Sequence, residues 1–261
     1  MVDGSWYLPG SGRDAAQEYA VAHIPGAVFF DLDASSDTRT SLPHMLPDPA
    51  SFAARMSPLG LNDTDDLIVY DGSGANLSAA RVWWTFRVLG HARVAVLDGG
   101  WGKWRAEGRP VERGSVSLPP GRFTARLDPR AVRDLTAMRL NLATRTEQVV
   151  DMRAAGRFTG NEPEPRPGLR RGHVPGSRNL PYDTLVAADG TILPEPELRR
   201  RLRAAGVDLS QPIIATCGSG TSACALLLCL ELLGHQATAL YDGAWTEWGG
   251  QPDTPVETGP P

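Results

Sequence analysis

The chain has 261 residues, which is enough for about two ordinary domains. Its hydrophobic content of 41% and charged content of 21% are typical of a soluble globular protein. The net charge of −4 gives no reason to expect binding to nucleic acid or to an anionic membrane surface. The longest apolar run, ACALLLCLELL, is too short to span a bilayer. We therefore expect no nucleic-acid partner and no membrane partner.

The cysteines and the N-terminus indicate a reducing compartment. Cys217, Cys224 and Cys229 lie close together, and an odd, clustered set does not suit a disulfide framework. Reduced thiols in the cytosol fit better. The opening stretch, MVDGSWYLPGSG, lacks a basic region followed by an apolar stretch, so we expect no signal peptide. A cytoplasmic location follows from these observations.

Three pairs of similar segments occur in the same order along the chain. AHIPGAVFFDLD resembles GHVPGSRNLPYD, LIVYDGSG resembles IIATCGSG, and LGHARVAVLDGGWGKW resembles LGHQATALYDGAWTEW. Collinear blocks of this kind indicate two copies of one domain. The first copy begins abruptly at VDGSWYLP, so its opening helix is expected to be absent or very short. His23 and His173 recur before a Pro-Gly step in both copies, which favours a repeated structural turn.

The domain boundaries follow from composition. Residues 113–130, within ERGSVSLPPGRFTARLDPR, are rich in Pro, Gly and Arg and are predicted to form a linker. The first domain is then 1–112 and the second domain is 131–261.

Each copy alternates short apolar strands with helical stretches. In the second copy the predicted order is strand EQVVDMR, helix PEPELRRRLRAAG, strand PIIATC, helix TSACALLLCLELLG, strand ATALYDG and a turn into AWTEWGG. Strands that alternate with helices indicate an α/β fold with a mostly parallel sheet. A parallel sheet is covered on both faces, which explains why these strands are continuous apolar runs.

Cys217 lies at the point where a predicted strand ends and a helix begins. Ligands bind beyond the carboxyl ends of the strands in open α/β sheets. The unpaired N–H groups and partial positive charge of a helix start, here near Thr221 or Ser222, would stabilise a thiolate. Gly218 and Gly220 let the backbone curl so that amides face the sulfur. The pattern predicts a nucleophilic cysteine in a cradle for an anionic sulfur.

Neighbouring positions narrow this chemistry. A cysteine phosphatase needs an arginine six positions after its cysteine, and here that position is Ala223. The first copy has Asp71 in place of Cys217, and a carboxylate cannot take up a transferable sulfur. We therefore expect the first domain to be catalytically silent. Cys224 and Cys229 lie within an apolar helix and are expected to be buried and inert.

The chain resembles the two-domain rhodanese-type sulfurtransferases, and among them the 3-mercaptopyruvate sulfurtransferases. The first copy contributes DGSWYLP, AHIPGAVFFDLD, PHMLP, ARVWWTFRVLGH and VLDGGW. The second contributes GRFTGNEPEPRPGLRRGHVPGS, CGSGTSA and YDGAWTEWG. The resemblance implies tandem rhodanese-like domains, each a central, mostly parallel sheet flanked by helices, with the active site in the second domain at the domain interface.

The resemblance also implies a ping-pong reaction. The thiolate of Cys217 attacks the sulfur of a small-molecule donor, becomes a persulfide and releases pyruvate. A thiol, a reduced thioredoxin-like protein or cyanide then accepts the outer sulfur. No cofactor or metal is implied, because the covalent persulfide is the carrier.

Several residues match the family's functional positions. Arg157 and Arg166 correspond to two arginines that hold the carboxylate of the sulfur donor, a pairing that suits the planar guanidinium fork. Ser219, His44 and Asp33 correspond to a proposed serine–histidine–acid relay, which could protonate the pyruvate enolate.

The loop sequence bears on the choice of sulfur donor. The usual mercaptopyruvate loop is CGSGVT, whereas this chain has CGSGTS, so Thr221 and Ser222 each present a hydroxyl. We expect these two residues, with Gly218 and Gly220, to contact the donor. Most thiosulfate-preferring relatives carry basic side chains directly after the cysteine, which the present loop lacks. The loop therefore favours 3-mercaptopyruvate.

Two alternatives stay open. The same machinery could prefer thiosulfate as the sulfur donor and cyanide as the acceptor. The chain could instead be a non-catalytic binding or regulatory rhodanese module. The presence of Cys217 argues against the second alternative, because silent modules usually lose the cysteine, as the first copy has.

Overall fold

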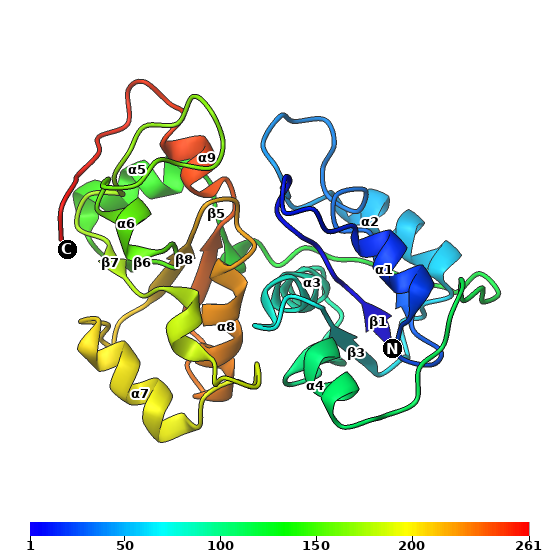
Figure 1. The fold of residues 1–261 in the computed structure, drawn as a ribbon. Helices are drawn as coiled ribbons and strands as arrows, with labels where there is room; N and C mark the ends of the chain where they lie inside the picture. The colour runs from blue at the N-terminus through cyan, green and yellow to red at the C-terminus, as the bar shows by residue number, and fades with distance from the viewer. Residues whose placement is uncertain (261) are drawn as a thin grey trace. The chain divides into compact units, whose positions relative to one another are not determined.

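The computed structural model describes residues 1–260, which form two compact units (Figure 1). The first unit comprises Met1–Arg39, Leu46–Pro129 and Ala187–Ile192. The second comprises Thr40–Met45, Arg130–Val186 and residues 193–260. Each unit contains a parallel sheet flanked by helices, as the sequence predicts. Within residues 1–260, no helix is both long and apolar enough to cross a membrane.

The first unit has a four-stranded sheet in the order β2-β1-β3-β4, and all neighbouring strands are parallel. Its strands are β1 (Val2–Asp3), β2 (Val28–Phe29), β3 (Leu67–Tyr70) and β4 (Val94–Val96). Its helices are α1 (Ala15–Val21), α2 (Pro49–Met56), α3 (Leu77–Val88) and α4 (Gly100–Ala106), with a 3-10 turn at Ser57–Leu59.

The second unit has a five-stranded parallel sheet in the order β5-β9-β8-β6-β7. Its strands are β5 (Val132–Arg133), β6 (Gln148–Asp151), β7 (Arg178–Asn179), β8 (Ile213–Thr216) and β9 (Thr238–Tyr241). Its helices are α5 (Leu135–Thr144), α6 (Ala155–Phe158), α7 (Glu195–Ala204), α8 (Ala223–Leu232) and α9 (Ala244–Trp248), with a 3-10 turn at Tyr182–Leu185. Another 3-10 turn, Pro129–Ala131, precedes β5.

The two sheets repeat one arrangement, which confirms the duplication predicted from the sequence. The order β2-β1-β3-β4 corresponds to β7-β6-β8-β9. The second unit adds β5 at one edge and α5 before β6. Over the residues described, the first unit contains no counterpart of this strand and helix, and β1 is its first element.

The central strand β8 is buried on both faces, which accounts for its continuous apolar sequence. Ile213, Ile214 and Ala215 are all fully buried. Figure 1 shows α5 and α9 on one side of this sheet and α7 and α8 on the other. Ile214 packs in a cluster with Met138 of α5 and Trp245 of α9. The covered sheet leaves its carboxyl edge, where the β-strands end, as the place for chemistry.

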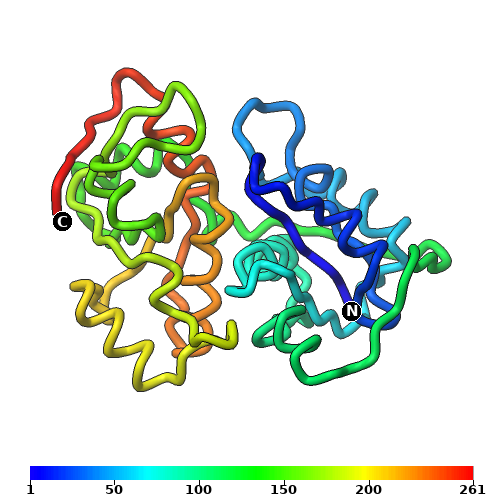
Figure 2. The backbone as a smooth tube through the Cα atoms, in the orientation of Figure 1, coloured from blue at the N-terminus to red at the C-terminus, as the bar shows by residue number. Residues whose placement is uncertain are grey.

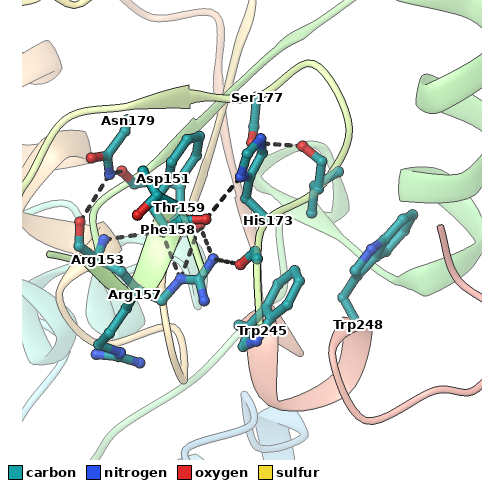
Figure 3. Close-up of polar contacts among 12 residues, drawn as sticks. Asp151, Arg153, Arg157, Phe158, Thr159, His173, Ser177, Asn179, Trp245 and Trp248 are labelled. Atoms are coloured by element: carbon teal, nitrogen blue, oxygen red, sulfur yellow. Dashed lines mark hydrogen bonds and ion pairs between the residues drawn. The ribbon is translucent and has the colours of Figure 1, made fainter. Parts of the chain in front are cut away.

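The repeated histidines are structural, as predicted. His173 stacks on Phe158 with ring centroids 3.7 Å apart, and its Nδ1 lies 2.8 Å from the Phe158 carbonyl oxygen (Figure 3). His23 repeats this arrangement with Tyr19, at 4.0 Å between centroids and 2.8 Å to the carbonyl oxygen. Both histidines are buried, so their rings serve to anchor the turn that precedes β2 or β7.

Two segments differ from simple expectations. The stretch AWTEWGG, for which only the turn leading into it was predicted, forms the short helix α9, because Trp245 and Trp248 both bury their side chains in the core of the second unit. Much of the predicted linker 113–130 packs on the first unit, where Phe123 lies against Phe52 with ring centroids 5.7 Å apart. The boundaries 1–112 and 131–261 stay a prediction.

Candidate active site

The β8–α8 loop places Cys217 at the carboxyl edge of the second sheet. Cys217 follows β8 directly, and α8 begins at Ala223 after the N-cap residue Ser222. The helix therefore starts within two residues of the predicted position. The chain turns from strand to helix in one tight loop (Figure 2), which is possible because Gly220 has a left-handed φ of 76°. Cys217 is only 1% exposed.

Helix α9 holds the first two carbonyl groups of this loop. The N–H of Trp245 donates to the Cys217 carbonyl at 2.9 Å. Thr246 donates twice to the Gly218 carbonyl, from its N–H at 2.9 Å and from its hydroxyl at 2.6 Å. The C=O and N–H of a planar trans peptide point in opposite directions. The amides that follow these carbonyls therefore point away from α9.

Four amides of the loop are left open. In the part of the chain that the structure describes, four backbone amides of the loop donate to no protein acceptor, those of Gly218, Ser219, Thr221 and Ser222. Unpaired N–H groups at a helix start, reinforced by the helix dipole, form a binding site for an anion. Such a site suits a thiolate and the outer sulfur of a persulfide.

The equivalent loop of the first unit is filled by its own carboxylate. Asp71 is buried, and its side chain accepts hydrogen bonds from the Ser73 N–H (2.8 Å), the Ser73 hydroxyl (2.6 Å), the Ser78 hydroxyl (3.1 Å) and the Ala79 N–H (2.7 Å). The backbone is held in the same way in both loops, because the Trp101 N–H donates to the Asp71 carbonyl as the Trp245 N–H does to the Cys217 carbonyl. This gives a physical reason for the predicted silence of the first domain.

Arg157 lies directly beside the cysteine loop. It is on α6, which follows β6 at the same edge of the sheet. A Cβ atom added to Gly218 would lie 2.8 Å from Nη2 of Arg157, so only a glycine lets the guanidinium approach this closely. The side chain is 24% exposed, and Glu164 accepts hydrogen bonds from its Nε (3.2 Å) and Nη2 (2.5 Å).

Glu164 links Arg157 to a buried ion pair. Its carboxylate also accepts a hydrogen bond from Nη1 of Arg153 at 2.8 Å, and Arg153 in turn pairs with Asp151 at 2.6 Å (Figure 3). Burial acts to lower the pKa of the Arg153 guanidinium, but Asp151 and Glu164 outweigh it and the pKa is raised. The two arginines and two carboxylates have no net charge.

The sequence reasoning missed these network residues, although comparison of the two copies could have indicated them. Arg153 and Thr246 correspond to Ser5 and Gly102 in the silent copy. Ser5 keeps only the backbone part of the arrangement, in which its N–H donates to Asp3 at 2.9 Å, as the Arg153 N–H does to Asp151. Positions where only the second copy has a charged side chain (Arg153) or gains a hydroxyl (Thr246) could therefore have indicated residues that serve its active site.

His44 meets the cysteine loop within the second unit. Its Nδ1 lies 3.1 Å from Oγ of Ser219 and 3.0 Å from Oγ1 of Thr221. All three residues are buried. The segment Thr40–Met45 belongs to this unit although its neighbours in sequence belong to the first. The contact between Ser219 and His44 is the one that the resemblance implies.

The remaining predicted residues lie as follows. Arg166 is two residues beyond Glu164 and is partly exposed. Asp33 lies in the first unit, where its carboxylate accepts a hydrogen bond from Nε1 of Trp6 at 2.9 Å. Cys224 is buried in α8, and its thiol donates to the Gly220 carbonyl at 3.3 Å. Cys229 is also buried in α8.

Replacement of Asp71 tests how the first loop is held. We expect Asp71→Ala to lower the free energy of unfolding by about 2–4 kcal/mol, because four donors lose a buried, charged acceptor. Asp71→Asn keeps one acceptor oxygen and should cost less. Urea unfolding of both variants measures the difference. An unchanged midpoint for Asp71→Ala would show that the carboxylate does not hold this loop.

Comparison with known proteins places the chain in a family. The family model for the rhodanese-like domain matches residues 13–107 and 134–251. The 3-mercaptopyruvate sulfurtransferase of Escherichia coli is 45% identical over 258 residues, which cover 98% of this chain and 91% of the relative. The mitochondrial thiosulfate/3-mercaptopyruvate sulfurtransferase 1 of Arabidopsis thaliana is 44% identical over 279 residues, covering 99% of this chain and 73% of the relative.

A solved structure agrees with these relatives. The crystal structure of the 3-mercaptopyruvate sulfotransferase SseA from Escherichia coli superimposes with a TM-score of 0.86 at 43% identity. The match covers 94% of this chain and 91% of SseA. Two matched rhodanese-like domains, near-full-length relatives and the repeated parallel sheets lead to one conclusion: the chain belongs to the rhodanese family and is a two-domain sulfurtransferase.

Proposed function

We propose that the protein moves sulfane sulfur from 3-mercaptopyruvate to an acceptor through a persulfide on Cys217. The observation that carries this proposal is the position of the Arg157 guanidinium beside Gly218, next to a loop with open amides. An anionic sulfur donor held by the guanidinium would have its sulfur close to Cys217. The persulfide is itself the carrier, so the proposed cycle uses no metal and no cofactor.

The transfer proceeds in two half-reactions. The Cys217 thiolate attacks the sulfur of the donor, a bond forms between the two sulfur atoms, and the carbon–sulfur bond breaks. The electron pair of that bond goes to carbon, which takes up the proton that the donor's thiol gives up and leaves as pyruvate. The open amides would stabilise the negative outer sulfur until a thiol, a reduced thioredoxin-like protein or cyanide removes it.

The charges around the loop favour a monoanionic sulfur donor. Glu164 neutralises Arg157, and Asp151 neutralises Arg153, so this network presents directed N–H groups with no net charge. Arg166, in the same segment, would add a second guanidinium for the donor's carboxylate. Gly218 and Ser219 add no charge. A thiosulfate dianion would find less compensation here, and we therefore place thiosulfate second.

Persulfide formation distinguishes the two donors. We expect 3-mercaptopyruvate to add the mass of one sulfur atom to the peptide that contains Cys217, and to do so faster than thiosulfate at equal concentration. Mass spectrometry after a short exposure to each donor measures this. Cys217→Ser should show no addition, whereas Cys229→Ala should behave as the parent protein. Faster labelling by thiosulfate would contradict the donor assignment, and labelling at another cysteine would contradict the nucleophile.

Loss of either proposed carboxylate-binding arginine should weaken donor binding. We expect Arg157→Ala and Arg166→Ala each to raise KM for 3-mercaptopyruvate roughly 10- to 150-fold, the range for a hydrogen bond to a charged group. Arg203→Ala, on the exposed side of α7, is the matched control and should leave KM unchanged. Steady-state kinetics with pyruvate detection measures the effect. Normal KM values in both site variants would remove their assigned role.

Glu164 should act through Arg157. We expect Glu164→Gln to raise KM for 3-mercaptopyruvate by about 10-fold, because a neutral amide holds the guanidinium less firmly than a carboxylate. Glu162→Gln, two residues away and exposed, is the control. A Glu164→Gln variant with the parent KM would show that Arg157 needs no partner for its orientation.

A further inference from the structure

Two hydroxyl groups, not one, meet the same nitrogen of His44. Oγ1 of Thr221 lies 3.0 Å from Nδ1, and Oγ of Ser219 lies 3.1 Å from it. Thr221 is 6% exposed and His44 is 3% exposed, so bulk water competes little for these contacts. By distance and burial, Thr221 is as good a partner for the imidazole as Ser219.

A third oxygen indicates where the imidazole proton lies. The carbonyl oxygen of Ser219 is 3.3 Å from the same Nδ1, and a carbonyl can only accept. Each of the three oxygens can accept from a proton on Nδ1, whereas a bare Nδ1 would leave the carbonyl facing a lone pair. The partners of a histidine nitrogen determine its tautomer. With Nδ1 protonated, its one N–H can be donated to either hydroxyl oxygen, and neither hydroxyl needs to donate its own proton to the imidazole.

The backbone of His44 supports a functional position for this ring. His44 has a φ of 60°, in the left-handed region that side chains other than glycine rarely adopt. Residues held in such conformations are fixed by their surroundings and cluster at functional sites. The first copy gives a second comparison, since it keeps Ser73 in place of Ser219 but has Ala75 in place of Thr221. The second hydroxyl is thus confined to the copy that has the cysteine.

We propose that Thr221 supplies a second proton-transferring hydroxyl beside His44, interchangeable with that of Ser219 in the proton transfer that accompanies sulfur transfer. This rests on the proposed function. When the carbon–sulfur bond breaks, the enolate carbon takes a proton from one hydroxyl, and that oxygen regains a proton from Nδ1 of His44. His44 recovers its proton from the donor's thiol. Either hydroxyl completes this path, and one proton moves overall from the thiol to the carbon.

The test is a comparison of single and double variants with 3-mercaptopyruvate. We expect Ser219→Ala and Thr221→Val each to keep kcat within about 5-fold of the parent protein, because the other hydroxyl remains. The double variant should lose about 100-fold or more in kcat with little change in KM, as expected for loss of general acid–base catalysis. It should match His44→Asn, since both lack the path.

A rescue variant distinguishes loss of the hydroxyl group from a change in side-chain packing. Ser219→Ala combined with Thr221→Ser keeps one hydroxyl and should return kcat to the level of the single variants. A Ser219→Ala variant as impaired as the double variant, or a failure of rescue, would overturn the proposal. Persulfide labelling of the parent protein is measured in parallel. If the parent protein forms no persulfide with 3-mercaptopyruvate, the proposed function is wrong. If labelling is normal but the losses in kcat of the two single variants simply add up to that of the double variant, only the proposed role of Thr221 is wrong.

Discussion

The chemistry depends on backbone amides that the fold leaves without a protein acceptor. Helix α9 fixes the carbonyls of Cys217 and Gly218, which turns the following N–H groups away from it. Burial without a partner costs free energy, so such amides persist only where the rest of the structure enforces them. The first unit shows the alternative outcome, because Asp71 supplies an anion and closes the same loop. Oxygen atoms of Ser5 and Ser73 take up further amides of that loop, so its closure depends on Asp71 together with these hydroxyl groups.

The buried charges beside the loop serve orientation more than attraction. Arg153 is enclosed between Asp151 and Glu164, with its guanidinium 4.3 Å from the ring centroid of Trp245. This fixed group holds Glu164, and Glu164 holds Arg157 at the open loop. A guanidinium that is already neutralised presents hydrogen-bond donors in a set direction without a large attractive field. The proposed preference for a monoanionic donor follows from this balance of charge.

Much of this architecture could be predicted from the sequence. The apolar strands, the duplication and the cysteine at the start of a helix follow from periodicity, internal similarity and glycine placement. The two-residue strands β1, β2, β5 and β7 are too short to leave a pattern, and pairing within a sheet defines them. The short helix α9 was not predicted, because burial of its two tryptophans stabilises it and burial is not visible in so short a segment.

The site was predictable only in part. The cysteine loop is local in sequence, so its glycines and helix start could be recognised directly. The partners of its side chains are not local: His44 and Ser219 are 175 residues apart, and only the resemblance connected them before the structure did. Glu164 and Thr246 act through contacts that no spacing rule encodes. Their hydrogen bonds to Arg157 and Gly218 arise from tertiary packing.

The most direct measurement is a crystal structure of the protein after reaction with 3-mercaptopyruvate in the absence of an acceptor. The account predicts a persulfide on Cys217 whose outer sulfur lies within hydrogen-bonding distance of at least two amides of the 218–222 loop. An outer sulfur directed into the apolar side chains of α8, away from these amides, would contradict it.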